Sequence, residues 1–294
     1  MKILAFLINL VPYHVARWNA VAKVSGNEVS VVQMRSQDEF SVLEATGAKL
    51  NFSLSTLGLL ETSMSSGQIF DPVAEAINSS CPDVIVISGY SFPISLAALK
   101  FGCENGIPVV ICSESNRDDF RRRWYIEAIK KRVIQLCSAG LVGARPQKEY
   151  LCELGLHSTQ IFEGYNVVDN KHFVRRGDDS RKNRMALRSS LGLPTDFFIA
   201  VARFTEKKNL DGLIESYCLL VESEGQSVPD LVILGDGPLR QLLESMIAKR
   251  GLGSKIHLLG AVSYELLPSY YALAKVFIHT SKTEQWGLVV NEAM

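Results

Sequence analysis

The sequence predicts an α/β protein made of two doubly wound domains, each with a parallel sheet. Short Val- and Ile-rich runs alternate with helical segments along the whole chain, as in parallel sheets covered by helices on both faces. A polar, charged stretch at residues 175–184 interrupts the alternation. At 294 residues the chain can bury two cores. We therefore expect Rossmann-like domains at residues 1–175 and 185–294, facing a cleft.

In the first half, each expected strand is a short apolar run and each expected helix follows such a run. The strands are Ile3–Ile8, Val29–Met34, Val84–Ile87, Val109–Cys112 and Gly140–Val142. The helices are Val15–Val24, Gln68–Asn78, Ile94–Glu104, Asp119–Leu136 and Gln147–Leu154. The first run could also be the apolar part of a signal peptide. A central strand is favoured, because the run is short and no small-residue cleavage site follows it.

The second half repeats the alternation. Its expected strands are Phe197–Val201, Leu231–Leu234, Ile256–Leu259 and Val276–His279. Its expected helices are Asn209–Val221, Leu239–Lys249, Tyr264–Ala272 and one that begins near Leu288. The chain stops soon after Glu292, so we expect a C-terminally truncated second domain with an exposed sheet edge. For the isolated chain we expect weak stability and little activity.

Composition excludes several classes of protein. Lys and Arg total 31, as do Asp and Glu, so no global field favours nucleic acid as a partner. The six cysteines form no Cys-x-x-Cys pair, which fits reduced thiols in a cytoplasmic protein and argues against a metal site. No apolar stretch reaches the length of a bilayer span. We expect a cytoplasmic protein.

A pair of cations follows the strand Phe197–Val201: Arg203 in the loop and Lys208 at the start of the next helix. Ligands of open α/β sheets bind beyond the carboxyl ends of the strands, so both cations should reach the crevice that holds the turn Glu284–Gly287. The arginine fork and the lysine point charge suit a diphosphate. The alternative is ordinary surface charge, although a cation near a helix N-terminus needs a compensating anion.

The turn itself has further features of an anion site. A helix that starts near Leu288 presents free backbone N–H groups, and Gly287 allows a ligand to approach closely. The loop Gly235-Asp-Gly-Pro238 after another strand should border the same crevice. There Asp236 is expected to cap the next helix, which accounts for most of the motif, and a direct ligand contact is the alternative.

Four motifs now stand in one order and spacing. They are Arg203…Lys208-Asn209, Gly235-Asp-Gly-Pro238, His257-Leu-Leu-Gly260, and Glu284 with seven residues between it and Glu292. This arrangement resembles the retaining family-4 glycosyltransferases of GT-B architecture. The resemblance is strong from Phe197 to Met294 and is supported upstream by the segment Gly164–Phe173.

The resemblance implies transfer of a sugar from a UDP- or GDP-linked donor to a glycan or lipid-linked acceptor, as in polysaccharide biosynthesis. It implies retention of configuration, with no cofactor and no metal. The implied catalytic residues are Arg203 and Lys208, which hold the diphosphate, and Glu284, which contacts the sugar hydroxyls. Glu292 would bind the ribose. Further donor contacts would fall on Gly235, Gly260, Val262, Gly287, Leu288 and Val289.

The first half departs from the family pattern. Many members carry a Gly-Gly loop after the first strand, where this chain has Asn9–Trp18. Many also carry a histidine after the fourth strand, where this chain has Ser88–Phe92, so that role is not transferred. His14 fits capping or packing better than catalysis. Tyr90 and Ser91 remain unassigned, and Glu114 is a weak candidate for acceptor hydroxyls.

The segment Arg117–Arg132 mixes basic and aromatic residues. One interpretation is contact with anionic lipid headgroups at the inner face of a membrane. The other is a solvated helix whose Trp124 and Ile129 lie in the core. Two rival functions also stay open: a nucleotide-sugar 2-epimerase of the same architecture, and a non-catalytic nucleotide-sugar binder. A dinucleotide dehydrogenase is disfavoured, because no G-x-G-x-x-G follows any strand.

Overall fold

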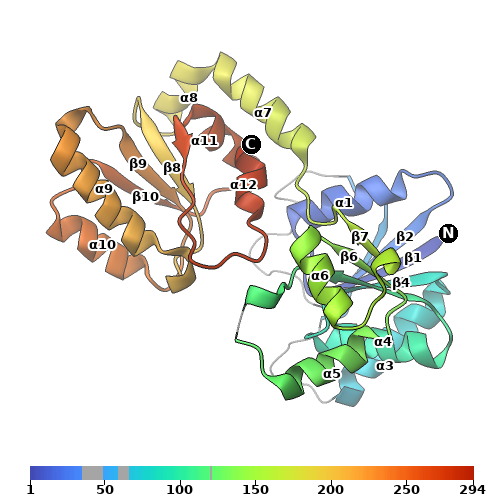
Figure 1. Cartoon of the computed structure of the whole chain (residues 1–294). Helices are drawn as coiled ribbons and strands as arrows, with labels where there is room; N and C mark the ends of the chain where they lie inside the picture. Colours follow the sequence, from blue (N-terminus) through green and yellow to red (C-terminus); the bar gives the residue numbers. More distant parts are fainter. Residues whose placement is uncertain (35–48, 59–65, 120) are drawn as a thin grey trace. The chain divides into compact units, whose positions relative to one another are not determined.

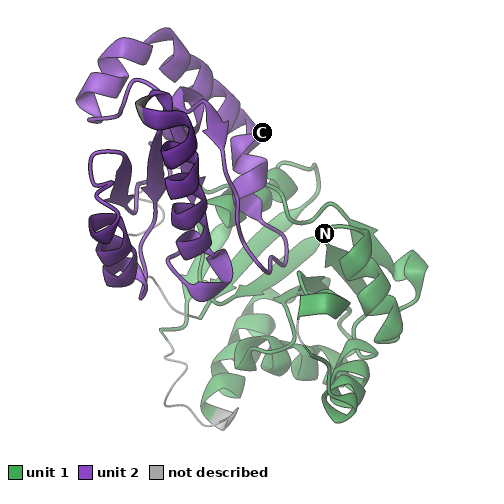
Figure 2. Cartoon of the chain, turned by 60° about the vertical axis from the view of Figure 1, so that its left-hand side comes forward, with its two compact units in different colours: residues 1–168 green, residues 169–294 purple. Residues whose placement is uncertain are grey.

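The computed structural model describes residues 1–34, 49–58, 66–119 and 121–294 (Figure 1). These residues form two compact units, Met1–Val168 and Asp169–Met294 (Figure 2). Each unit is built on one parallel β-sheet. The segments 35–48 and 59–65 and residue 120 lie outside the described residues. Every expected strand and helix lies within them, apart from residue 120 of the expected helix Asp119–Leu136.

The sheet of the first unit has the strand order β3-β2-β1-β4-β5-β6-β7, and all its pairs are parallel. The strands are β1 Lys2–Leu7, β2 Glu28–Gln33, β3 Ser53–Thr56, β4 Val84–Ser88, β5 Val109–Ser113, β6 Ala139–Val142 and β7 Ile161–Glu163. The helices are α1 Pro12–Ala22, α3 Ser66–Ser80, α4 Pro93–Glu104, α5 Trp124–Ile134 and α6 Arg145–Glu153. A short 3-10 turn, η1 Arg117–Asp119, precedes α5.

Strand β1 shows why a continuous apolar run marks a parallel strand. Its alternate residues Leu4 and Phe6 pack in the core cluster that includes α3 and α4. Ala5 and its neighbours on the opposite face pack with Val15 and Trp18 of α1. Since successive side chains point to opposite faces and both faces are covered, the five positions after the exposed Lys2 are all apolar.

The sheet of the second unit has the order β10-β9-β8-β11 and is also parallel. Its strands are β8 Phe197–Val201, β9 Asp230–Leu234, β10 Ile256–Gly260 and β11 Val276–Phe277. Its helices are α7 Asn170–Lys182, α8 Arg184–Ser190, α9 Leu210–Glu224, α10 Arg240–Lys249, α11 Leu267–Leu273 and α12 Leu288–Ala293.

The alternation predicted from sequence is confirmed, with three differences. The edge strands β3 and β7 were not expected, because edge strands need not be apolar on both faces. The charged stretch 175–184, expected to separate the two domains, lies within α7 and the start of α8, and α7 packs on α11 of the second unit. Strand β11 is shorter than the expected Val276–His279.

Candidate functional site

The strand order of the second unit defines a switch point beside β8. From β8 the chain runs outward through β9 and β10 on one side and returns to β11 on the other. The loops that follow β8 and β11 therefore leave neighbouring parallel strands at the same edge of the sheet. Such a switch point is where ligands bind in open α/β sheets. These two loops carry Arg203, Lys208 and Glu284.

Backbone and side-chain hydrogen bonds join the two loops. The Thr280 hydroxyl donates to the carbonyl oxygens of Lys208, at 3.1 Å, and Asn209, at 3.3 Å. The Lys282 amide donates to the Lys207 carbonyl at 2.8 Å. Asn209 has φ +54°, a left-handed conformation that Asn tolerates, and the chain turns there into α9. The position of Lys208 is thus set by the loop after β11.

Lys208 and Glu284 form the central contact of the site. The Lys208 ammonium donates to Glu284 Oε2, and the two side chains are 13% and 25% exposed. His279 Nε2 lies 3.3 Å from the same oxygen. Burial by itself would raise the pKa of Glu284, but Lys208, with Ser281 and His279 nearby, holds that pKa below its usual value. Glu284 is therefore an anion, and it is the anion that a cation at the start of α9 requires.

Gly287 fixes the turn that follows. Its φ of +78° is left-handed, and a Cβ at this position would lie 3.1 Å from Glu284 Cγ. A glycine lets the turn close onto the Glu284 side chain. Gly287 also precedes α12, whose first turn contains Leu288 and Val289 without a side-chain cap.

Arg203 differs from Lys208 in its surroundings. Its side chain is exposed, and among the described residues it makes no hydrogen bond or ion pair. Only its carbonyl is engaged, by the Thr205 amide at 2.8 Å. The fold thus brings Lys208 and Glu284 together. Arg203 lies on the loop after β8, as Lys208 does, but its guanidinium contacts no other described side chain.

The Gly235-Asp-Gly-Pro238 loop supports the loop after β8. A Cβ on Gly235 would lie 1.9 Å from the Ala202 carbonyl oxygen, and one on Gly237 would lie 2.7 Å from the Phe204 carbonyl oxygen. Both glycines also have positive φ, +129° and +155°. The two backbones can approach this closely only without side chains.

The expectation that Asp236 caps the next helix is wrong. The residue before α10 is Leu239, and no side chain caps that helix. Asp236 Oδ1 instead accepts from the amide of Gly237 at 2.7 Å, and Asp236 Oδ2 accepts from Arg240 at 3.3 Å. The aspartate stabilises its own turn because its short side chain reaches the adjacent N–H before the helix begins.

Two further expected donor contacts lie beside this loop. The Gly260 carbonyl accepts from the Gly235 amide at 2.8 Å, which ties the end of β10 to the loop. Gly260 has φ +83°, and Val262 follows it in a half-buried position. Both residues therefore lie at the carboxyl end of the sheet, where β9 separates them from β8 and the switch point.

Glu292 lies on α12 and is held by a residue that the sequence did not single out. Tyr271 of α11 donates to Glu292 Oε2 at 3.0 Å. Burial raises the pKa of Glu292, and the Tyr271 hydrogen bond opposes that rise only in part. Both residues line a groove of about 420 Å³ between α7, α11 and α12. No sequence signal identified Tyr271, because its role depends on the packing of α11 beside α12.

The polar residues suspected in the first unit lie at the carboxyl ends of β1, β4 and β5. Burial, followed by the Arg17 charge, lowers the pKa of His14 to about 3, so its imidazole is neutral. Glu114 Oε1 accepts from Asn166 at 2.7 Å. Tyr90 is half-buried against the core, and Ser91 is exposed. None of these contacts assigns catalysis.

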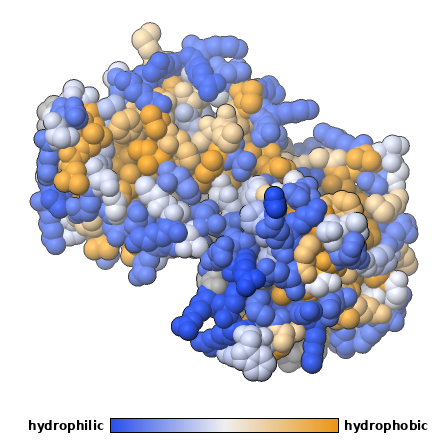
Figure 3. Space-filling view, in the orientation of Figure 1, coloured by the Kyte–Doolittle hydropathy of each residue, from blue (hydrophilic) through white to orange (hydrophobic). Residues whose placement is uncertain are grey.

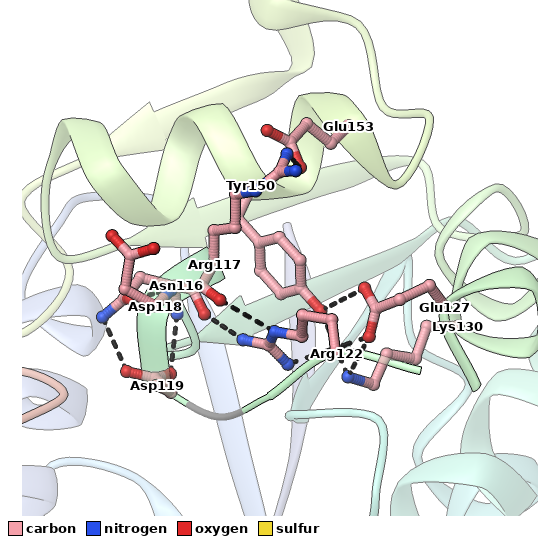
Figure 4. A network of polar contacts seen from close by, with 9 residues as sticks. All are labelled: Asn116, Arg117, Asp118, Asp119, Arg122, Glu127, Lys130, Tyr150 and Glu153. Carbon is pink, nitrogen blue, oxygen red and sulfur yellow. Dashed lines mark hydrogen bonds and ion pairs between the residues drawn. The ribbon is translucent and has the colours of Figure 1, made fainter. Parts of the chain in front are cut away.

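The interpretation that Trp124 and Ile129 are core residues is wrong. Trp124 is 83% exposed and Ile129 is 61% exposed, and Ile134 is the one buried residue among the described positions of α5. Helix α5 is instead held to α6 by polar contacts (Figure 4): Tyr150 of α6 donates to Glu127 of α5 at 2.7 Å and accepts from Lys130 of α5 at 3.1 Å. Hydrophilic side chains gather over the segment that leads into α5 (Figure 3).

Other kinds of site have no support among the described residues. They contain no group of three or more His, Cys, Asp or Glu side chains placed to hold a metal. All six cysteines are free thiols. In the part of the chain that the structure describes, no helix has both the length and the apolar character needed to cross a membrane.

Comparison with solved structures defines the fold class as α/β of the GT-B type. Sucrose-phosphate synthase from Thermosynechococcus elongatus matches 100% of this chain and 79% of its own, with TM-score 0.68 and 15% identity. UDP-GlcNAc 2-epimerase from Methanocaldococcus jannaschii matches 94% of this chain and 78% of its own, with TM-score 0.65 and 15% identity. At such identities the likeness concerns the fold alone.

Sequence comparison is more specific. Residues 184–294 match the family model described as Glycosyl transferases group 1. The chain is 34% identical over 111 residues to alpha-monoglucosyldiacylglycerol synthase of Acholeplasma laidlawii, a match to 37% of this chain and 27% of that protein. It is 32% identical over 117 residues to alpha-D-kanosaminyltransferase of Streptomyces kanamyceticus, covering 40% and 30% respectively. The chain thus spans less than a third of the length of either relative.

Proposed function

We propose that the protein is a glycosyltransferase that takes a sugar from a nucleotide-diphosphate donor, UDP- or GDP-linked. The observation that carries the proposal is the Lys208–Glu284 contact at the switch point beside β8. Support comes from the group 1 glycosyl transferase match, which covers both residues. The site offers a cation for a diphosphate and a carboxylate for sugar hydroxyls, which is what such a donor presents.

In this proposal the residues divide the donor between them. Lys208 and the unoccupied Arg203 guanidinium hold the diphosphate and stabilise the charge that develops on it as the glycosidic bond breaks. Glu284 accepts hydrogen bonds from the sugar, and Glu292 from the ribose. Backbone N–H groups at Gly287, Leu288 and Val289 add to the diphosphate contacts. Transfer proceeds with retention of configuration, to an acceptor bound by the first unit.

One of the expected donor contacts has a different role here. Gly235 supports the loop of Arg203 and Lys208 from behind, because its Cα lies against the Ala202 carbonyl. Gly260 and Val262 follow β10 at the same edge of the sheet and keep their assignment to the base edge of the nucleotide.

The test is calorimetric titration of the full chain with UDP, GDP and their sugars. Replacement of Lys208 by Met removes the ammonium and should weaken nucleotide-diphosphate binding at least about tenfold, the worth of one charge-assisted hydrogen bond. The matched control is Lys207→Met, since Lys207 is the exposed neighbour and its side chain faces solvent. Equal affinities for the two variants, both folded by circular dichroism, would refute the assignment.

The proposal includes catalysis without a metal, because Arg203, Lys208 and the backbone N–H groups near Gly287 can neutralise the diphosphate. Activity and donor affinity should therefore survive in excess EDTA. A complete loss in EDTA that Mg²⁺ or Mn²⁺ reverses would contradict this part of the proposal.

One alternative has specific support, because the UDP-GlcNAc 2-epimerase of Methanocaldococcus jannaschii shares the fold. The spacing of Glu284 and Glu292 and of Arg203 and Lys208 argues against it. Incubation with UDP-GlcNAc followed by NMR separates the possibilities. A 2-epimer would establish an epimerase, released free sugar or a glycosylated acceptor a transferase, and binding without turnover a non-catalytic binder.

We also propose that α5 rests on a membrane surface, at the cytoplasmic face, where it would meet a lipid-linked acceptor. Trp124, Tyr125 and Ile129 are exposed apolar or aromatic side chains, and the exposed Arg121 and Arg123 precede them directly. Aromatic rings with flanking cations suit the interface of anionic lipids.

Co-sedimentation with phosphatidylglycerol vesicles tests this surface. The double variant Arg121→Gln/Arg123→Gln should lose most binding, whereas Arg145→Gln, an exposed arginine on α6, should keep it. Binding that is absent from the wild type, or equal in both variants, would remove the membrane role.

A further inference from the structure

His279 lies in the loop after β11 and has no part in the donor contacts proposed above. Its Nε2 is 3.3 Å from Glu284 Oε2, and its side chain is 21% exposed. Its ring stacks on that of Phe277, with 6.1 Å between the ring centres and 21° between the planes. Phe277 in turn makes an edge contact with Tyr271 of α11, at 5.6 Å. The imidazole is thus supported by an aromatic ring and meets the Glu284 carboxylate with its Nε2 edge.

The backbone on either side of His279 is also fixed. The Ile278 amide donates to the Ile199 carbonyl of β8 at 2.7 Å, and the Thr280 hydroxyl donates to the Lys208 carbonyl at 3.1 Å. These hydrogen bonds join the loop after β11 both to strand β8 and to the loop that carries Lys208. The backbone that carries His279 is therefore placed by the sheet itself.

Lys208 and His279 share one oxygen of Glu284, because both basic side chains meet Oε2. A carboxylate that is held through one oxygen presents its other oxygen in a fixed direction, as an acceptor for a ligand hydroxyl. The Glu284 side chain is 25% exposed, so its charge is only partly solvated and benefits from a basic partner. The nearby Ser281 hydroxyl is neutral and supplies no such charge.

Donor binding would draw Lys208 away from this oxygen. In the proposed function its ammonium holds the diphosphate, which carries more negative charge than a single carboxylate. An ammonium has three N–H donors on a flexible stem and can turn toward a phosphate oxygen, whereas the stacked imidazole of His279 has no such reach. Glu284 would then keep His279 as its basic partner among the described residues. A partly buried carboxylate that lost both partners would be costly.

We propose that His279 is a positioning residue that holds Glu284 in place for the donor sugar while Lys208 engages the diphosphate. Its Nε2–H donates to Glu284 Oε2, and this hydrogen bond persists when the ammonium turns to a phosphate oxygen. A neutral imidazole is sufficient, provided that Nε2 carries the proton. The inference rests on the proposed glycosyl transfer. It adds a residue that affects recognition of the sugar without touching it.

The tautomer of His279 tests the contact in the absence of any ligand. Long-range ¹H–¹⁵N spectra of the full chain distinguish an imidazole that is protonated on Nε2 from one protonated on Nδ1 alone, and the variant His279→Gln assigns the His279 signals among the five histidines. We expect a proton on Nε2. A neutral His279 protonated on Nδ1 alone would overturn the proposal, because its Nε2 could not donate to Glu284.

Calorimetric titration then tests the effect on the sugar. The probes are UDP with UDP-glucose and UDP-GlcNAc, and GDP with GDP-mannose. The measured quantity is the affinity for the sugar nucleotide that binds best, divided by the affinity for its nucleoside diphosphate. The variant His279→Phe keeps a ring beside Phe277 and removes the donor, and it should lower this ratio about tenfold, the worth of one charge-assisted hydrogen bond.

The conservative variant His279→Gln should keep most of the ratio, because its side-chain amide places an N–H donor near the position of the imidazole Nε2. A role in packing alone would change thermal stability in both variants and leave the ratio fixed. An unchanged ratio in His279→Phe, or an equal fall in both variants, overturns the proposal.

His257→Phe is the matched control. His257 Nε2 lies 2.9 Å from Asp230 Oδ2, the same kind of contact, at the amino end of the same sheet. This variant should leave the ratio unchanged. If sugar nucleotides bind and the ratio stays fixed in His279→Phe, the positioning role fails and the proposed function stands. If no nucleotide binds the wild type, the proposed function fails, and the tautomer of His279 still decides whether it can donate to Glu284.

Discussion

Removal of the Lys208 ammonium should destabilise the second unit by an amount that the structure bounds. Exposed ion pairs contribute up to about 1 kcal/mol, and removal of one partner of a fully buried pair costs about 3–5 kcal/mol. The Lys208 and Glu284 side chains are 13% and 25% exposed, so the pair lies between these limits. We expect Lys208→Met to lower the free energy of unfolding by about 2 kcal/mol, roughly a 30-fold change in the equilibrium.

The loss should depend on pH in a defined direction. The pKa of Glu284 is lowered in the folded state, so its ion pair stabilises the fold above the pKa of the unfolded chain, about 4.3. That stability disappears as pH falls through the lower, folded pKa. The wild type should therefore lose more stability than Lys208→Met as the pH falls below the unfolded value of about 4.3, and the two curves should converge at the acid end.

Fluorotryptophan NMR under urea denaturation measures this locally. The chain has three tryptophans, and Trp286 lies in the second unit, whereas Trp18 and Trp124 lie in the first. A double-mutant cycle with Glu284→Gln should give a coupling energy of about 1–2 kcal/mol from the Trp286 signal. A coupling below about 0.5 kcal/mol, or an equal shift of the Trp18 transition, would refute the reasoning.

Three other predictions follow from the same unit. Gly235→Ala places a Cβ 1.9 Å from the Ala202 carbonyl oxygen at φ +129°, so it should cost at least about 3 kcal/mol in thermal unfolding, whereas Gly253→Ala, with open space around it, should be neutral. Tyr271→Phe removes the hydrogen bond to Glu292 and should raise the carboxyl pKa further, as followed by ¹³C NMR, at a cost of about 1 kcal/mol. Because the pKa of Glu292 is raised in the folded state, the wild type should lose stability as the pH rises through that pKa. The variant Glu292→Gln has no such titration and should lose less free energy of unfolding over the same pH range; a larger loss than in the wild type would contradict a buried Glu292 carboxyl group.

Much of the fold follows from local patterns. Strand β8 has the bounds expected from its apolar run, Phe197–Val201, because a strand buried on both faces excludes polar residues along its whole length. The edge strand β3, Ser53–Thr56, carries no such pattern, because its side chains are largely exposed, and it was missed. Helix α7 was missed because its charged sequence offers only a narrow apolar stripe, including the buried Phe173.

The candidate site divides in the same way. The residue types and spacing of Arg203, Lys208 and Glu284 indicated an anionic, hydroxyl-rich ligand before any coordinates. Their actual partners were not visible, since Lys208 meets Glu284 across 76 positions of sequence. The same holds for His279 beside Glu284, and for the Arg17 and Asn166 contact in the first unit.

The sequence by itself determined the α/β alternation, the parallel sheets and the residues with the right chemistry, because periodicity and residue type are local properties of the chain. The tertiary structure decided which of these residues meet. Strand order places the loop after β11 beside the loop after β8, so a carboxylate far along the chain neutralises Lys208. The tertiary structure also decided which side chains are exposed. Helix α5 buries Ile134 and leaves Trp124 in solvent, because burial depends on what packs against the helix and not on the sequence of the helix alone.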